Sequence, residues 1–166
     1  MRIFKEEQRF NQLWLIIVMA LSVLVTIGII LGTYSNDPSS FSGLELILVI
    51  GVTILAAGLI FLFKLSTRID EFGIHYKFFP FHRSFKVIKW NEIHNAFVRK
   101  YSAVSEYGGW GLRGSLLWNK SKRKAINVSG TIGIQLILKN GNKLLIGTQK
   151  QNEAESVLAT YKSKFN

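Results

Sequence analysis

The sequence predicts a membrane-anchored α+β protein, in which a hairpin of two transmembrane helices precedes a β-sheet domain closed by a C-terminal helix. Three observations predict this class. Two long apolar blocks without a charge come first, short runs rich in β-branched and aromatic residues follow, and an amphipathic segment ends the chain. Such blocks are typical of membrane spans, so we expect an integral membrane protein rather than a soluble one.

The two apolar blocks, Leu13 to Thr33 and Leu46 to Phe63, contain 21 and 18 residues. As helices they would be roughly 27 to 32 Å long, close to the roughly 30 Å hydrocarbon core of a bilayer. The first block is longer than the apolar part of a signal peptide, so we expect it to be retained. The predicted divisions are a cytoplasmic N-terminal segment (1–12), two transmembrane helices (13–33 and 46–63), a short external loop (34–45) and a cytoplasmic domain (64–166).

Charge predicts the orientation of this hairpin. The loop between the blocks has no Lys or Arg, whereas the chain from Lys64 onward has 18 basic and 6 acidic residues. Basic segments stay on the cytoplasmic side. We therefore expect a multi-pass protein of the cytoplasmic (inner) membrane with both termini in the cytoplasm.

Small residues in the two blocks would allow helix backbones to approach closely. They would either pack the two spans together or drive formation of a homo-oligomer, and the pattern leaves both open. No ionisable residue lies near the middle of either block, which disfavours a transporter or channel. The small residues that we single out are Gly28, Gly32, Gly51 and Gly58.

From Leu65 onward, turn signals separate a series of short β runs, and an Asn-Gly pair marks a tight hairpin. The N-terminal residues Phe4, Phe10 and Trp14 alternate with charges, which predicts an interfacial amphipathic turn or an extension of the first helix. The predicted strands are Leu65–Glu71, Gly73–Phe79, Phe85–Trp90, Ile93–Val104, Arg113–Trp118, Ala125–Val128, Ile132–Lys139 and Asn142–Thr148, the fifth and sixth being weaker, and the predicted helix is Lys150–Phe165.

Several short motifs carry a resemblance to a known family. They are a Gly-Ile-x-x-x-Phe-Phe strand (73–79), a Trp-Asn-Glu-Ile turn (90–93) and a Leu-Lys-Asn-Gly-x-Lys hairpin (138–143) before the terminal helix. With two preceding spans, this order resembles the bacterial pleckstrin-homology-like (PH-like) membrane-anchored proteins. The resemblance implies a seven-stranded, partly open barrel or sandwich capped by the C-terminal helix. It implies no particular activity, because fold does not dictate function.

Two segments stand out as candidate binding sites. Residues 106–114 contain four glycines, together with Tyr107, Trp110 and Arg113, which are residue types common at interfaces. This segment is either a loop that presents Trp110 to a partner or headgroup, or a bulge whose Trp fills the barrel mouth. The second segment is a basic run that would contact anionic lipid or form a solvated hairpin tip. Its members are Lys120, Lys122, Arg123 and Lys124.

Other functional classes lack support in the sequence. There is no Cys, and the three His residues have neither metal-ligand spacing nor a neighbouring triad partner. The glycine-rich segment lacks the Lys-Ser/Thr ending of a nucleotide-binding loop, and the positive charge is explained by topology rather than by nucleic acid. We expect no enzyme activity, no metal, no cofactor and no nucleic-acid partner.

The leading hypothesis is a non-catalytic interaction module that binds a protein partner or anionic lipid headgroups on the cytoplasmic face. The alternative is a regulatory or assembly subunit of a larger membrane complex, recognised through its transmembrane helices.

Overall fold

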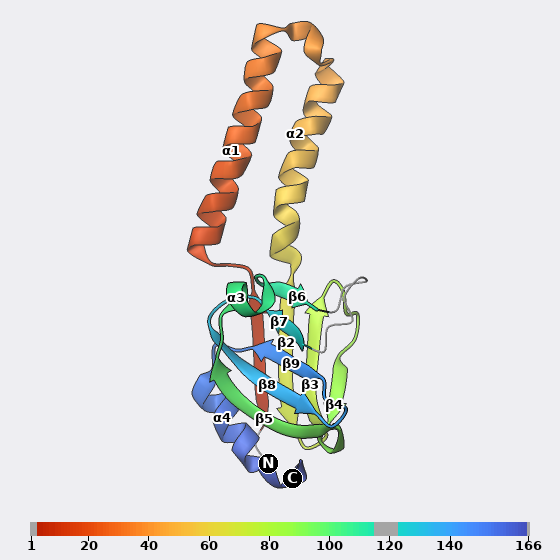
Figure 1. The fold of residues 1–166 in the computed structure, drawn as a ribbon. Coiled ribbons are helices and arrows are strands. Elements are labelled where there is room, and N and C mark those ends of the chain that lie inside the picture. Colours follow the sequence, from red (N-terminus) through yellow and green to blue (C-terminus); the bar gives the residue numbers. More distant parts are fainter. Residues whose placement is uncertain (1–2, 115–122, 166) are drawn as a thin grey trace. The chain divides into compact units, whose positions relative to one another are not determined.

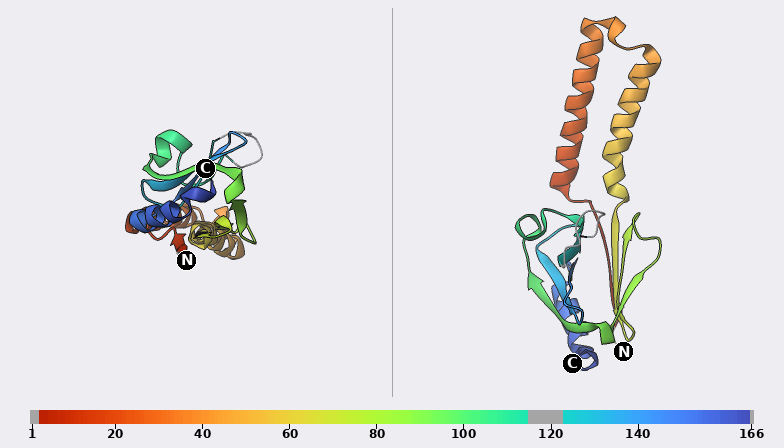
Figure 2. Two further views of the ribbon diagram at one scale, coloured as in Figure 1. Left: turned by 90° about the horizontal axis from the view of Figure 1, so that it is seen from below. Right: turned by 45° about the vertical axis from the view of Figure 1, so that its right-hand side comes forward.

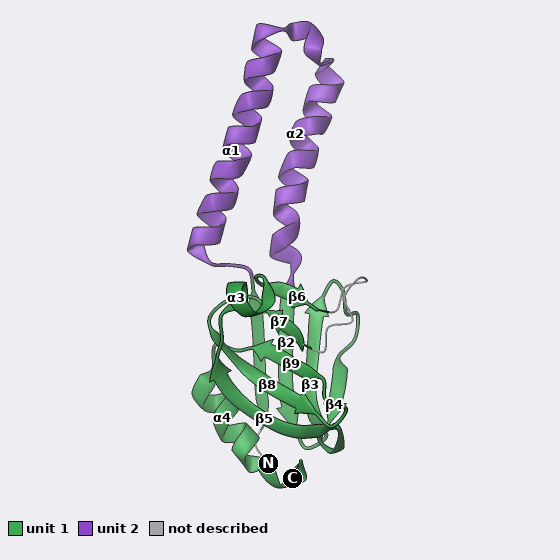
Figure 3. Cartoon of the chain, viewed as in Figure 1, with its two compact units in different colours: residues 1–9, 64–166 green, residues 10–63 purple. Residues whose placement is uncertain are grey.

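The computed structural model describes residues 3–114 and 123–165 of the chain. It divides the chain into two compact units (Figures 1 and 3). One comprises Phe10–Phe63 and is helical, and the other comprises Met1–Arg9 with Lys64–Asn166 and is built mainly of β-strands. The helical unit is therefore inserted between the first strand of the β-unit and the rest of that unit.

The helical unit is a hairpin of two helices. Helix α1 spans Leu13–Asn36, and helix α2 spans Gly43–Gly58 and continues as the 3-10 helix η2 (Leu59–Leu62). Both are long and apolar enough to cross a membrane, and no residue of α1 or α2 is buried. The two predicted helices are thus present, the first ending three residues later and the second beginning three residues earlier than expected.

Side-chain caps order the connection between these helices. Asp37 accepts a hydrogen bond from the Ser39 N–H at 3.0 Å, at the start of the short 3-10 helix η1 (Pro38–Ser40). Ser42 and Glu45 form a reciprocal capping box, with bonds of 2.8 and 3.3 Å, that starts α2. Each cap satisfies backbone N–H groups that the helix itself leaves without acceptors.

The first sheet of the β-unit has the strand order β1-β2-β3-β4, with every pair antiparallel. The pairing of Arg9 with Lys64 ends the β1–β2 ladder, so the chain leaves the sheet for the helices and returns from them at neighbouring positions. The strands are β1 (Phe4–Arg9), β2 (Lys64–Asp70), β3 (Gly73–Phe79) and β4 (Lys86–Lys89).

Strand β1 corrects the prediction for residues 4–9 of the N-terminal segment, which form neither an interfacial turn nor an extension of α1. Alternate residues Phe4, Glu6 and Gln8 are buried. The Glu6 carboxylate accepts from the Thr148 hydroxyl at 2.6 Å and from a backbone N–H at 2.8 Å, and Gln8 donates to the Gly147 carbonyl at 2.8 Å. Two of the three inward residues are polar, so the hydrophobic pattern could not identify the strand, and their partners are far away in sequence.

The second sheet has the order β5-β8-β9-β7-β6, antiparallel except for the parallel pair β7–β9. The predicted strand Ile93–Val104 ends at Lys100, and the short helix α3 (Ala103–Tyr107) follows. Most of the predicted strand 113–118 lies outside the described residues. The strands are β5 (Ile93–Lys100), β6 (Gly111–Arg113), β7 (Arg123–Asn127), β8 (Ile132–Leu138) and β9 (Lys143–Gly147).

The two sheets face each other, as Figure 2 shows, and enclose the core. Helix α4 (Gln151–Thr160), with the 3-10 helix η4 (Lys162–Lys164) after it, packs against β1 and β5, which are edge strands of the two sheets. Trp90, at the corner between the sheets, stacks on Tyr161 and Phe165 at ring-centroid distances of 5.2 and 5.5 Å. The β-unit is thus a two-sheet α+β domain with one side covered by the predicted C-terminal helix. Its largest fully buried side chains include Leu65, Ile69, Ile74, Phe78, Ile93, Ile134, Leu136, Leu145 and Ile146.

Candidate functional site

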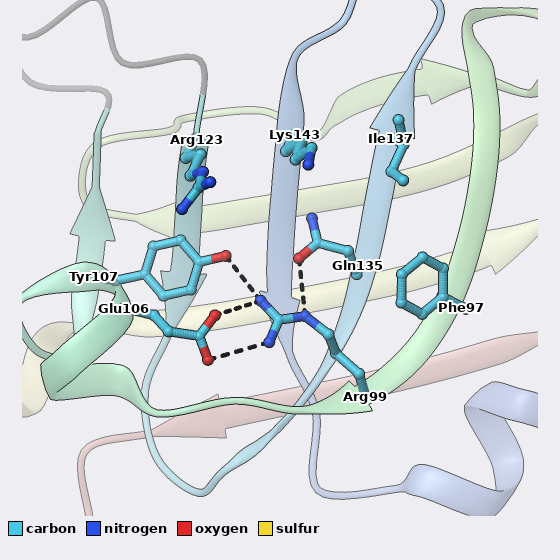
Figure 4. A pocket seen from close by; sticks show the side chains of 8 residues that line it. All are labelled: Phe97, Arg99, Glu106, Tyr107, Arg123, Gln135, Ile137 and Lys143. Carbon is cyan, nitrogen blue, oxygen red and sulfur yellow. Dashed lines mark hydrogen bonds and ion pairs between the residues drawn. The ribbon is translucent and has the colours of Figure 1, made fainter.

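A pocket of about 270 Å³ lies on the outer face of the five-stranded sheet, at its contact with α3 (Figure 4). Strand alternation places its residues on this face: Gln135 of β8 lies between Ile134 and Leu136, which point into the core. The lining residues are Phe97, Arg99, Glu106, Tyr107, Arg123, Gln135, Ile137 and Lys143.

Helix α3 forms the wall of this pocket that carries Glu106. Ser102 accepts from the Ser105 N–H at 3.2 Å, and Glu106 accepts from the Ser102 N–H at 2.9 Å, so the helix start is capped from both directions. Gly108, in the left-handed conformation at φ 72°, ends the helix. Because of these local interactions, the residues that were predicted to end the strand form a short helix instead. This helix holds Glu106 and Tyr107 beside the sheet.

Arg99 is the centre of the polar network (Figure 4). Its two terminal nitrogens donate to the two carboxylate oxygens of Glu106 at 3.1 and 2.6 Å. One of them also donates to the Tyr107 hydroxyl at 3.3 Å, and Nε donates to Gln135 Oε1 at 3.1 Å. A bidentate pair of this kind fixes the orientation of the guanidinium as well as neutralising it. The pair raises the pKa of Arg99 and lowers the pKa of Glu106, so both stay charged at neutral pH.

Gln135 forms part of the pocket floor and is buried. Its amide nitrogen donates to the carbonyls of Leu136 and Leu144 at 3.2 and 3.3 Å. Because the nitrogen is engaged by backbone carbonyls, the amide oxygen is directed to Arg99. Gln135 therefore acts as a rigid support for Arg99 that links it to the backbone of two strands.

Arg123 and Lys143 add positive charge on the other side of the pocket. They are directly opposite each other in the parallel β7–β9 pair. Like charges at opposed positions of neighbouring strands repel each other. With Arg99, the lining residues thus carry three cations and one carboxylate, and that carboxylate is held by Arg99. The charge of Arg123 also contributes to the lowered pKa of Glu106, and the net positive charge of the lining favours an anion in the pocket.

The glycine-rich segment covers a small apolar cluster beside the pocket, on the same face of the sheet. The cluster consists of Tyr101, Ala103, Ala125 and Leu145, and Tyr107 and Trp110 pack against it. The Tyr101 hydroxyl accepts from Asn127 at 3.0 Å, and Asn127 in turn accepts from the Gly111 N–H at 2.9 Å. Burial raises the pKa of Tyr101, which keeps this hydroxyl neutral. The position of Trp110 is therefore set by its packing against this cluster. Tyr107 also packs against the cluster, and its hydroxyl lies in the pocket beside Arg99.

The remaining basic residues predicted as a site are dispersed or lie outside the described residues. Arg113 is exposed in β6, where its Nε donates to the Trp110 carbonyl at 3.0 Å. Lys124 is exposed in β7, next to Arg123. Lys120 and Lys122 lie outside the described residues. Of the five predicted binding residues that the structure describes, the pocket brings together Tyr107 and Arg123.

Sequence reasoning missed Arg99, Gln135 and Lys143. Gln135 and Lys143 are the polar residues of otherwise apolar strands, Arg99 lies near the end of the mixed strand β5, and the strand period assigns all three to the outer face. This alternation of inward and outward positions was the signal in the sequence that could have identified these residues. It could not show that β5 pairs with the β8–β9 hairpin and so brings these side chains to one place.

The four glycines of the helical hairpin do not lie at a close contact between α1 and α2. A methyl group added at Gly28, Gly32, Gly51 or Gly58 would meet no atom within 4 Å. The interpretation that these residues pack the two helices together has no support in this structure.

A second polar cluster joins two neighbouring strands at the β2–β3 turn. The buried Asp70 carboxylate lies 2.9 Å from His75 Nε2 and 2.9 Å from Arg68 Nε. Burial alone would raise the pKa of Asp70, but the bonds from His75 and from the Phe72 N–H outweigh it, so the pKa is lowered. The sequence analysis did not identify the pairing of Asp70 with His75. Among the described residues, no group of three or more His, Asp or Glu side chains could hold a metal ion.

Comparison with protein-family models found no family that matches the chain, and comparison with curated proteins found no match either. The class of protein defined by the structure is an α+β domain of two sheets and a C-terminal helix, joined to a hairpin of two apolar helices.

Proposed function

We propose that the chain is a membrane-anchored, non-catalytic interaction module whose PH-like β-domain binds an anionic lipid headgroup in the Arg99 pocket. The α1–α2 hairpin would span the cytoplasmic membrane with both termini in the cytoplasm, as the charge distribution predicts. The proposal of a PH-like fold rests on the two facing sheets and the C-terminal helix.

The observation that carries the binding proposal is the gathering of three cations, Arg99, Arg123 and Lys143, around a single carboxylate in the pocket lining, which leaves the pocket with a net positive charge. A phosphodiester in the pocket would place its negative charge beside Arg123 and Lys143 and accept charge-assisted hydrogen bonds from cationic side chains. A domain tethered to the cytoplasmic face would meet anionic headgroups at high local concentration, and each basic residue near such a surface contributes about 1 kcal/mol.

The test uses the full chain in a neutral detergent, because β1 belongs to the domain and a fragment that begins after the helices would lack it. Short-chain phosphatidylglycerol and phosphatidylcholine with the same acyl chains are titrated, and thermal unfolding is followed by tryptophan fluorescence. Ligand at about 100 times its dissociation constant stabilises a protein by about 2.7 kcal/mol. We expect stabilisation by the anionic lipid only.

The matched variants are Arg123→Gln with Lys143→Gln, and Lys89→Gln with Lys139→Gln as the control. Both pairs remove two positive charges, but the control pair lies outside the pocket and is exposed. The lipid effect should vanish in the first pair and persist in the second. Equal stabilisation by both lipids, or equal loss in both variant pairs, would overturn the proposal. Glycerol phosphate, tested alongside, separates headgroup recognition from recognition that requires the acyl chains.

A second candidate function is that of a subunit recognised through its helices. The open surroundings of Gly28 and Gly32 favour it, because a neighbouring helix could approach there. Substituting both by Leu should then remove co-purifying membrane proteins while headgroup binding stays intact. An unchanged set of co-purifying proteins would argue against this candidate.

A further inference from the structure

The β3–β4 loop carries exposed aromatic residues. Phe79, Phe81 and Phe85 are 42%, 52% and 47% exposed, and Val87 of β4 is 44% exposed. Phe79 and Val87 lie on the outer face of the sheet, because their neighbours Phe78 and Ile88 are buried. An exposed group of large apolar side chains in one short segment usually marks a contact surface.

The loop is held in shape from within. The His82 side chain is buried, and its Nδ1 accepts from the Phe78 N–H at 3.2 Å while the His82 N–H donates to the Phe78 carbonyl at 2.8 Å. The Phe81 ring stacks on the Phe78 ring, with nearly parallel planes and a centroid distance of 6.0 Å. The Tyr76 ring contacts the His82 ring edge to face. The loop therefore presents Phe81 from a fixed scaffold, at little entropic cost on binding.

The register of the first sheet specifies which end of the domain this loop occupies. Lys64 pairs with Arg9 on one side and with Phe79 on the other. The chain passes to the helical unit after Arg9 and returns at Lys64, so Phe79 and the loop after it lie at the end of the sheet where both connections begin (Figure 1).

The connections at this end are short. One residue, Phe63, separates η2 from β2, and three residues separate β1 from α1. Three extended residues span at most about 11 Å. If the helices cross a bilayer, the sheet end that carries the β3–β4 loop must lie close to its surface.

The charge of the loop suits that surface. Residues 79–87 contain Arg83 and Lys86, both exposed, and no acid. Aromatic rings favour the headgroup region of a bilayer, and Lys and Arg are attracted to anionic lipids there.

We propose that the β3–β4 loop inserts Phe81 and Phe85 into the interfacial region of the membrane that the α1–α2 hairpin spans, and so forms a third membrane contact. This inference rests on the membrane anchoring in the proposed function, but not on ligand binding in the Arg99 pocket. The proposed partner of the loop is the bilayer interface. The proposed ligand of the Arg99 pocket, which lies on the other sheet, is instead a single lipid headgroup.

The absence of Cys allows one probe at a time in the full chain. Ser84→Cys places an environment-sensitive fluorophore in the loop without removing a Phe, and Phe72→Cys places it at the β2–β3 turn. Phe72 is 66% exposed and lies at the other end of the same strands, about 20 Å away along a seven-residue strand. Leu24→Cys places the fluorophore within α1 and reports whether the helix is in the bilayer.

The labelled chains are reconstituted into vesicles of phosphatidylcholine and phosphatidylglycerol that contain lipid with a nitroxide near the headgroup. A probe at position 84 should shift its emission to the blue and be quenched, and a probe at position 72 should do neither. The effect at position 84 should be lost with Phe81→Ser and Phe85→Ser, and kept with Phe72→Ser.

Three results would overturn the inference. If the probe at position 84 stays in water while a probe at position 24 is quenched by nitroxides deep in the acyl chains, the helices anchor the protein and the loop does not insert. If probes at 84 and 72 respond alike, the loop has no special contact. If the probe at position 24 is not quenched, α1 is not in the bilayer, and both the anchoring proposal and this inference fail. The phosphatidylglycerol titration in detergent tests the Arg99 pocket separately.

Discussion

Arg99 and Glu106 form a two-point ion pair, with distances of 3.1 and 2.6 Å, across the pocket on the outer sheet. The pair joins the end of β5 to α3, which no backbone ladder connects. It also determines how much positive charge the pocket offers to a ligand, because Glu106 offsets one of its three cations.

Replacing Glu106 with Gln should increase the affinity of the pocket for anions. The substitution keeps the size of the side chain and removes the negative charge, so the pocket gains a net unit of positive charge. Both partners are partly exposed, so the loss of folding free energy should be about 0.5 to 1 kcal/mol. Titration with phosphatidylglycerol in neutral detergent should show tighter binding for Glu106→Gln than for wild type. Weaker binding would mean that Glu106, rather than the cations, contacts the ligand.

Glu6 and Glu7 are neighbours in β1 that should differ strongly in their effect on stability. Glu6→Ala leaves the Thr148 hydroxyl and the Gln149 N–H without their buried acceptor, which should cost about 1 to 3 kcal/mol. Glu7→Ala removes the same charge, an exposed pair with Lys64 and a long hydrogen bond of 3.3 Å from the Ser66 hydroxyl, which together should cost less than about 1 kcal/mol. Denaturant unfolding of the full chain measures both. Equal effects would show that β1 is not a structural part of the domain.

His82 should make the domain less stable as the pH falls below its ordinary pKa. Burial and the nearby Lys86 lower the pKa of His82 in the folded state. Its ring accepts the Phe78 N–H through Nδ1, which a protonated ring cannot do. The unfolded chain therefore binds the proton more readily, and stability that is full above about pH 6.5 declines as the pH falls through the folded pKa.

The variant His82→Gln should remove this part of the pH dependence. Unfolding free energies measured between pH 7.5 and 5 should fall less steeply for the variant than for wild type. The window lies above the range in which Asp70 and Glu106, with lowered pKa values, take up protons. An equally steep decline in both proteins would assign the effect to another group.

Alanine substitutions at Gly114 and Gly141 would test whether the backbone at Gly114 lies as close to β7 as the structure shows. Both have positive φ, 72° and 81°. A Cβ at Gly114 would collide with the carbonyl oxygen of Arg123, whereas one at Gly141 would meet no atom within 4 Å. Gly141→Ala should therefore cost about 1 kcal/mol from backbone strain alone, and Gly114→Ala clearly more. Thermal unfolding in detergent gives the comparison, and a smaller loss for Gly114→Ala would contradict the pairing of this segment with β7.

Local patterns were sufficient to predict most of the elements. The apolar blocks predicted α1 and α2 because membrane-length apolar helices need no long-range information. The run Gly73 to Phe79 predicted β3 with its observed bounds, and Asn140-Gly141 predicted the β8–β9 hairpin, since turn chemistry acts within a few residues. The C-terminal helix followed from the spacing of Val157, Leu158 and Tyr161.

Tertiary structure decided what these patterns could not. Strand β1 depends on buried Glu6 and Gln8, whose partners lie more than a hundred residues away, so its hydrophobic signal was too weak to identify. The site depends on the parallel pairing of β7 with β9, which brings Arg123 beside Lys143, and on α3, which places Glu106 against Arg99. Composition and period specify which face a residue occupies, but the meeting of side chains from distant strands depends on register and strand order, which only the folded chain defines.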